Sequence, residues 1–172
     1  MFKSPGFTLL ELTITLAILM IMATIALPLY HQFMASVELK NSSRLLTIHI
    51  QKAKYDAILR HKSVVLCPSA DLSTCNNSNW DTSLISFVDT NQNLQRENNE
   101  EVLTNVELAH RYGSLKFQKF GKKLNSIVFQ GDTGLPRESN GTFTYCSYNQ
   151  LKNFKLVLSK MGHTRLEDLK NC

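Results

Sequence analysis

Glu11 is the first residue in this sequence whose type and position could do chemistry. It is the single charged residue in the apolar run of residues 7–30. An ionisable side chain in a segment that could enter a lipid bilayer is costly and usually marks a function. A carboxylate in a low-dielectric environment is tolerated mainly when it pairs with a cation. We therefore expect Glu11 to need a positively charged partner.

A basic region near the end of the sequence is the second candidate for chemistry. Residues 81–107 contain six acids and one base, a net charge of −5, whereas residues 111–165 contain ten bases and two acids, a net charge of +8. Such a region could bind phosphate groups, or it could be an ordinary solvated surface. The residues that we expect in a phosphate-binding patch are Lys152, Lys155, Lys160, His163 and Arg165.

The alternation of side chains along a strand predicts the orientation of one residue of this patch, Lys155. Residues 154–159 alternate so that Lys155 lies opposite Phe154 and Leu156 and should point to solvent. A second basic cluster without an acid could extend the patch, contact anionic lipid head groups or form a solvated loop. This cluster consists of Arg111, Lys116, Lys119, Lys122 and Lys123.

The apolar run that contains Glu11 is long enough to anchor the chain in a membrane. Its 24 residues would form about 36 Å of helix, enough to cross the core of a bilayer. A cleaved secretory signal would end in a small-residue site of the A-x-A kind, and none follows this run. An ordinary single-pass anchor would explain the hydrophobicity but leaves Gly6 and Glu11 unexplained.

The elements that must position these residues follow from hydrophobic periodicity. Residues 31–62 place an apolar stripe on one helical face, which consists of Ala35, Leu39, Leu46, Ile50, Ala53 and Ala57. Short apolar or alternating runs then predict strands at residues 63–66, 84–88, 115–117, 126–129, 142–146 and 154–159. We expect an Asn-rich solvated loop at residues 91–99 and a tight turn at Asn140 and Gly141. The predicted fold class is α+β, with a long N-terminal helix packed on an antiparallel sheet.

The N-terminal motif resembles a known processing signal. Residues 6–11, with the sequence GFTLLE, are similar to the prepilin cleavage signature of type IV pilins and type II secretion pseudopilins. The resemblance implies that a prepilin peptidase cuts after Gly6 and that Phe7 becomes the N-methylated first residue. It also implies that Glu11 pairs with the Phe7 amine in the growing filament.

The remainder of the chain resembles the GspH/FimT family of minor pilins and pseudopilins. The resemblance is carried by VLCPS at residues 65–69, Cys75 followed by Trp80, ISFVD at 85–89, GTFTYC at 141–146 and GHTR at 162–165. It implies a long helix on a β-sheet head, often sandwich-like, in a low-abundance subunit at or near a filament tip.

Four cysteines in an exported head favour disulfide bonds, because the periplasm is oxidising. The sequence permits three pairings, and we expect Cys67 with Cys75 and Cys146 with Cys172. The first bond would close a short loop and the second would tie down the end of the chain. A zinc site is the alternative, but no two cysteines have the C-x-x-C spacing that is typical of one.

Some FimT-like minor pilins bind DNA through a basic Gly-Arg-x-Arg motif, and this resemblance concerns Gly162 and Arg165. His163 stands where the first Arg of that motif is expected. Arginine is permanently charged and bidentate toward phosphate, whereas an ordinary histidine is mostly neutral at pH 7. DNA is therefore an expected partner through a site weaker than the family motif.

Together these patterns predict a minor pilin-like subunit with four segments. They are a leader at residues 1–6, a transmembrane and assembly helix at 7–30, its amphipathic continuation at 31–62 and a periplasmic β head at 63–172. The expected partners are other pilins or pseudopilins, a prepilin peptidase, the bacterial inner membrane before assembly, and DNA. The alternatives are a GspH-like pseudopilin of a type II secretion system and a priming minor pilin that does not bind DNA. No catalytic motif is recognisable, and we expect neither enzymatic activity nor a cofactor or metal.

Overall fold

The computed structural model describes residues 6, 8–76, 80–120, 125–148 and 152–172. By its internal contacts the chain divides into two units, Met1–Met34 and Ala35–Cys172. One helix, α1 (Leu9–Arg60), contributes to both units. Within α1 the helix continues through Pro28, where one backbone hydrogen bond is necessarily missing.

The first half of α1 is apolar around its whole circumference. Its leucine, isoleucine and methionine side chains are exposed, and its threonines turn their hydroxyl groups back onto the helix. Thr13, Thr15 and Thr24 donate to the carbonyl oxygens three residues earlier, at 2.9, 2.9 and 2.8 Å. The polar groups of these side chains are thus satisfied within the helix, as a lipid environment requires.

The second half of α1 buries one face, as the sequence predicts. Ala35, Leu46, Ile50, Ala53 and Ala57 are buried, and Leu39 packs against the same core. Small alanines in this stripe let the helix approach the strands closely. The predicted apolar stripe is therefore confirmed.

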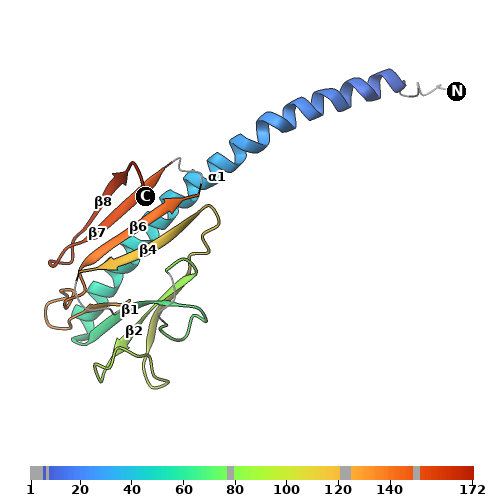
Figure 1. Cartoon of the computed structure of the whole chain (residues 1–172). Coiled ribbons are helices and arrows are strands. Elements are labelled where there is room, and N and C mark those ends of the chain that lie inside the picture. Colours follow the sequence, from blue (N-terminus) through green and yellow to red (C-terminus); the bar gives the residue numbers. More distant parts are fainter. Residues whose placement is uncertain (1–5, 7, 77–79, 121–124, 149–151) are drawn as a thin grey trace. The chain divides into compact units, whose positions relative to one another are not determined.

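The head contains two four-stranded antiparallel sheets that lie beside the second half of α1 (Figure 1). The first sheet has the order β3-β2-β1-β5, formed by β3 (Val102–Glu107), β2 (Ser83–Asp89), β1 (Ser63–Ser69) and β5 (Ile127–Phe129). The second has the order β4-β6-β7-β8, formed by β4 (Gly113–Lys119), β6 (Gly141–Ser147), β7 (Asn153–Leu158) and β8 (Thr164–Leu169). The predicted α+β fold with an antiparallel head is confirmed.

One core joins the helix to both sheets. Trp80, Phe143, Tyr145 and Phe154 are among its largest fully buried side chains. The Trp80 ring meets Phe143 edge-on at 4.9 Å, and its indole N–H donates to the Asn125 carboxamide oxygen at 2.9 Å. A smaller apolar cluster lies apart from this core and contains Val65, Cys67, Ile85, Phe87 and Val128, with Cys75 and Leu94 packed against it.

Three local features differ from the expectations. Strands β3 and β8 were not predicted, because both are half-exposed edge strands of mixed polarity. The tight turn expected at Asn140 and Gly141 is wrong, since neither residue has a positive φ and Gly141 is the first residue of β6. A side chain at Gly141 would collide with the Gln118 carbonyl oxygen, so close packing explains this glycine.

Candidate functional sites

The N-terminal end of α1 is closed by a hydrogen-bonded cap. The Glu11 carboxylate accepts the backbone N–H and the hydroxyl of Thr8 at 2.9 and 3.0 Å, and the Glu11 N–H donates to the Thr8 hydroxyl oxygen at 3.2 Å. This is a capping box, in which a Thr and a Glu three residues later satisfy helix-terminal donors. The sequence analysis missed it, although the spacing T-x-x-E is visible in the chain.

The other residues of the processing motif are placed only in part. Gly6 is exposed, and nothing lies within 4 Å of the position that a Cβ atom would take. Phe7 lies outside the described residues. Cleavage after Gly6 and pairing of Glu11 with the Phe7 amine both stay predictions.

One helix of the described chain, α1, is long and apolar enough to cross a membrane. Its most apolar 18-residue window has a mean hydropathy of 2.4, and none of that window is buried in the protein. Core helices of soluble proteins can meet the same criteria of length and composition, but they are mostly buried. The complete exposure of this stretch, together with the Glu11 motif, suggests membrane anchoring.

The C-terminal basic residues gather at the turn between β7 and β8. Lys160 and His163 are exposed in this turn, which the Ser159 N–H closes by donating to the His163 carbonyl at 2.9 Å. Gly162 has φ of +72°, a conformation that a side chain would strain. The turn thus presents an exposed lysine and an exposed imidazole.

Strand register brings further basic residues onto the outer face of the second sheet. Phe154, Leu156 and Leu158 are buried, and Lys155 between them is half-exposed on the other face, as predicted. Pairing across the sheet places residues Lys116, Thr144, Lys155 and Glu167 in one row. The neighbouring row consists of Gln118, Thr142, Val157 and Arg165. Lys116, from the second basic cluster, therefore shares the face of Lys155 and Arg165.

Glu167 partly neutralises this outer face. Its carboxylate forms an ion pair with Arg165 at 2.5 Å, and the Arg165 side chain is 76% exposed. Glu167 is also the cross-strand neighbour of Lys155. An exposed ion pair contributes little to stability, so Arg165 can exchange Glu167 for another anion.

The helix supplies two residues that the sequence analysis missed. Gln51 of α1 donates to the Gly162 carbonyl and to the Thr164 hydroxyl, both at 3.5 Å. The Lys54 ammonium lies close enough to Gly162 that an added Cβ would be 3.3 Å from it. Lys54 therefore adds a positive charge beside Gly162 of this turn, and only tertiary packing could reveal this.

Other predicted patch residues lie away from the turn. Lys152 is exposed before β7, whereas Lys160 follows its far end, so the length of β7, roughly 20 Å at 3.3 Å per residue, separates them. Lys122 and Lys123 lie outside the described residues. We define the basic tip as Lys54, Lys155, Lys160, His163 and Arg165.

Two disulfide bonds hold the head, and their pairings are those expected from the sequence. Cys67 bonds Cys75 at the edge of the smaller apolar cluster, and Cys146 of β6 bonds Cys172. The second bond ties the segment that follows β8 to the centre of the second sheet. It thereby holds the strand that contains Arg165.

A polar network joins α1 to β6 and to the segment just before β4. The Glu38 carboxylate accepts the Tyr145 hydroxyl at 2.6 Å and the Arg111 and Tyr112 N–H groups at 2.8 and 3.0 Å. The Ser42 hydroxyl meets His110 Nε2 at 2.6 Å, and the His110 side chain is fully buried. Burial lowers the pKa of His110, and the carboxylates of Glu38 and Asp81 oppose this effect.

The fold of a long N-terminal helix with an antiparallel β head is similar to that of solved minor pilins and pseudopilins. The structure of the type IV minor pilin FimU of Pseudomonas aeruginosa aligns with a TM-score of 0.57 at 16% identity, covering 81% of this chain and 98% of that one. The minor pseudopilin EpsH from the type 2 secretion system of Vibrio cholerae aligns with a TM-score of 0.52 at 15% identity, covering 76% and 97%. At these identities the similarity shows the fold.

Sequence comparison then defines the family. The family described as type II transport protein GspH matches residues 42–162, and the prokaryotic N-terminal methylation motif matches residues 1–27. The fimbrial protein EcpB of Eikenella corrodens is 39% identical over 72 residues, which cover 41% of this chain and 44% of that protein. The match thus spans less than half of that curated relative. The chain belongs to the GspH family, and it is a minor pilin or pseudopilin of a type IV pilus or type II secretion system.

Proposed function

We propose that this protein is a minor pilin whose head binds DNA at the basic tip during natural transformation. The observation that carries the proposal is that Lys160 and His163 lie in the β7–β8 turn, Lys155 and Arg165 lie on the outer face of the two strands that it joins, and Lys54 lies beside Gly162. These residues come from a helix, two strands and a turn, so their grouping is not a consequence of sequence proximity alone. Binding would depend on phosphate contacts, because no base-reading motif accompanies them.

The N-terminal end supports assembly into a filament. We infer that a prepilin peptidase cuts after Gly6 while the chain is held in the inner membrane by α1. The new Phe7 amine then pairs with Glu11 as the subunit joins other pilins. The exposed apolar half of α1 would pack against the same segments of its neighbours, and the head would be displayed at or near the filament tip.

DNA binding is tested by a salt titration of the full-length protein in detergent micelles with fluorescently labelled duplex DNA. We expect affinity to fall between about 50 and 200 mM salt, with a log–log slope near −0.9 per phosphate contact. The double variant Lys160→Ala/Arg165→Ala should reduce the steepness of that slope by about 1.8. Lys62→Ala, which removes an exposed lysine outside the basic tip, is the matched control and should behave as the wild type.

The same titration can also test a variant that should bind DNA more tightly. Glu167→Gln removes the carboxylate that pairs with Arg165 and neighbours Lys155, so it should strengthen DNA binding at low salt. Absence of any binding at low salt contradicts the DNA proposal. Binding that is unchanged in both the double variant and Glu167→Gln places the activity elsewhere on the protein.

The second candidate is a pseudopilin of a type II secretion system that contacts exported proteins. The description of the matched family and the similarity to EpsH favour it. In this case the head would show no DNA binding, and deletion of the gene would abolish export of a folded protein while transformation continued.

A further inference from the structure

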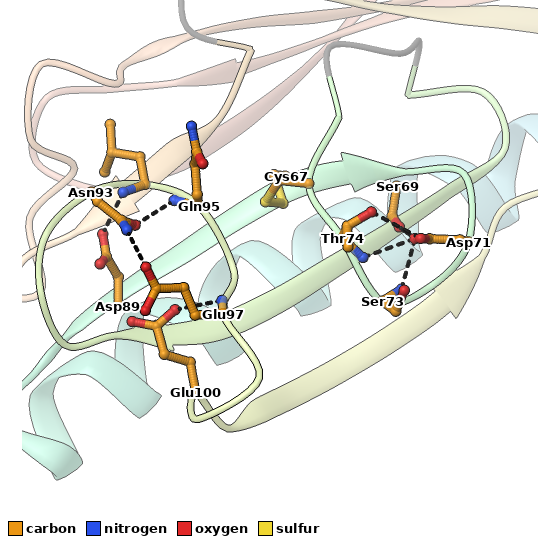
Figure 2. The surroundings of a disulfide bond; sticks show 12 residues. Cys67, Ser69, Asp71, Ser73, Thr74, Asp89, Asn93, Gln95, Glu97 and Glu100 are labelled. Atoms are coloured by element: carbon orange, nitrogen blue, oxygen red, sulfur yellow. Dashed lines mark hydrogen bonds between the residues drawn. A yellow bond between two sulfur atoms is a disulfide. The ribbon is translucent and has the colours of Figure 1, made fainter.

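The loop between β2 and β3 carries oxygen-bearing side chains at regular intervals. It runs for twelve residues, from Asp89 at the end of β2 to Glu100 just before β3. At loop positions 1, 3, 5, 9 and 12 stand Asp89, Asn91, Asn93, Glu97 and Glu100. Figure 2 shows that the labelled members of this set point into one region beside the Cys67 disulfide.

This spacing is that of a calcium-binding loop. The pattern D-x-[DN]-x-[DN]-G-x5-E places side-chain ligands at positions 1, 3 and 5, a main-chain carbonyl at 7, a water-mediated ligand at 9 and a bidentate Glu at 12. The chain matches every position except the sixth, where Leu94 replaces Gly. Leu94 nevertheless has φ of 64°, the conformation that glycine supplies at that position. Its side chain packs on the smaller apolar cluster of the head.

One carboxylate oxygen in the loop is buried without a partner. Asp89 is 2% exposed, and its Oδ2 accepts the Leu94 N–H at 3.1 Å. Its Oδ1 is buried and has no hydrogen-bond partner among the described residues. A buried anionic oxygen without a hydrogen bond or counter-charge is strongly unfavourable. A cation at this point would remove that cost.

A second buried carboxylate lies next to the first. Glu100 is 4% exposed, and its two oxygens accept the N–H groups of Thr90 at 2.9 Å and Glu97 at 3.1 Å. Two like charges buried this close repel each other unless a cation lies between them.

No basic side chain of the described residues supplies that counter-charge. Arg96 belongs to the loop and Arg137 lines a pocket with Asp89, yet neither forms an ion pair with Asp89, Glu97 or Glu100 in the described parts of the chain. The Arg137 guanidinium contacts the Gln92 carboxamide oxygen at 3.5 Å.

The donor set identifies the ion. The described residues contain no cluster of three or more His, Cys, Asp or Glu side chains in a metal-binding arrangement, so the carboxylates of this loop do not form a metal site by themselves and carboxamide and main-chain oxygens must complete it. Calcium takes six to eight oxygens, including carboxamides, main-chain carbonyls and water. The Asn93 carboxamide already donates to Glu97 at 2.8 Å, which holds loop positions 5 and 9 side by side.

We propose that residues 89–100 bind one Ca²⁺ ion. Asp89, Asn91, Asn93 and Glu100 supply side-chain oxygens, Gln95 supplies its main-chain carbonyl, and Glu97 acts through a water molecule. This site is independent of DNA binding. The sequence analysis expected only an Asn-rich solvated loop at residues 91–99 and no metal.

Calcium titration of the full-length protein in micelles tests the proposal, after removal of bound ions with a chelator. Isothermal calorimetry should show one site per chain, with Kd in the range of about 10⁻⁴ to 10⁻³ M that extracellular modules display. Saturating calcium should also raise Tm. Glu100→Gln should weaken binding by about tenfold or more, since even outer-shell ligands of metal sites contribute that much.

Matched variants separate a ligand role from a folding role. Asn91→Ala removes an exposed proposed ligand and should weaken binding, whereas Asn98→Ala removes an exposed asparagine of the same loop at a non-ligand position and should not. Glu107→Gln, an exposed acid on β3, is the control for loss of charge. The proposal is overturned if the wild type shows no saturable calcium binding and no Tm shift. It is equally overturned if Glu100→Gln and Asn91→Ala both bind as the wild type does.

Discussion

Glu11 combines two properties that a single substitution can separate. Its carboxylate caps α1 through Thr8, and we propose that its negative charge pairs with the Phe7 amine in the filament. The sequence analysis predicted the second property from the high cost of a charge in an apolar run. Glutamine preserves a capping box but lacks the charge.

We expect Glu11→Gln to leave membrane insertion intact and to abolish most incorporation into filaments. Thr8→Ala is the matched variant, because it weakens the cap by about 1 kcal/mol and keeps the charge. Its incorporation should remain near that of the wild type. The measurement is the amount of subunit in sheared filaments relative to the membrane fraction, by immunoblot. Normal incorporation of Glu11→Gln would show that the cap alone explains this residue.

Residue patterns predicted the apolar positions better than the polar contacts. The helix stripe from Ala35 to Ala57 and the inward set of β7 follow from periodicity alone. The row that joins Lys116 to Lys155 depends on strand register, which the sequence does not specify. The same holds for Lys54, which reaches the basic tip only through tertiary packing.

At the scale of elements, the missed strands share a cause. Both β3 and β8 are edge strands, so each is paired on one side and partly exposed on the other. Their polar and charged residues conceal the alternation that identifies a strand, as in the sequence TRLEDL of β8. Inward and edge-facing charges of this kind also discourage pairing with other chains. Strands β3 and β8 form because they pair with β2 and β7, and this pairing is known only from the folded structure.

The two disulfide bonds should differ in their effect on stability. Cys146 and Cys172 are 26 residues apart and Cys67 and Cys75 only 8, so loop-closure entropy predicts losses of about 3.5 and about 2.5 kcal/mol when each pair is replaced by Ala. Denaturant unfolding of the two double variants measures this difference. The Cys146→Ala/Cys172→Ala variant should also increase hydrogen exchange in β8. Equal losses with no change in β8 would contradict the proposed anchoring of that strand.

At the scale of the whole molecule, the network around Glu38 links the folding of the head to pH. The His110 side chain is buried, and burial lowers its pKa from the ordinary value of 6.5. The unfolded chain therefore binds a proton at a pH where the folded chain does not, and acidification favours unfolding. The raised pKa of Asp89 has the opposite effect on stability. Just above its ordinary pKa of 3.8 the folded chain binds a proton that the unfolded chain does not, so acidification in that range favours folding.

We expect the Tm of the wild type to fall as pH decreases through about 6.5, the His value of the unfolded chain. His110→Gln should show a shallower dependence, although His49, whose pKa is also lowered by burial, retains part of it. For a chain of this size, each 1 kcal/mol lost lowers Tm by about 2–4 °C. His163→Gln, at an exposed position, is the control. Parallel curves for the wild type and His110→Gln would refute the role of this imidazole.

The threonines of the first half of α1 have a consequence for how the subunit changes environment. Each hydroxyl already has an acceptor one turn back, so no polar bond must break when lipid tails give way to neighbouring helices. Lipid tails and packed aliphatic side chains solvate such a rod almost equally well. Transfer of this helix between lipid and neighbouring apolar helices would therefore cost little free energy in either direction.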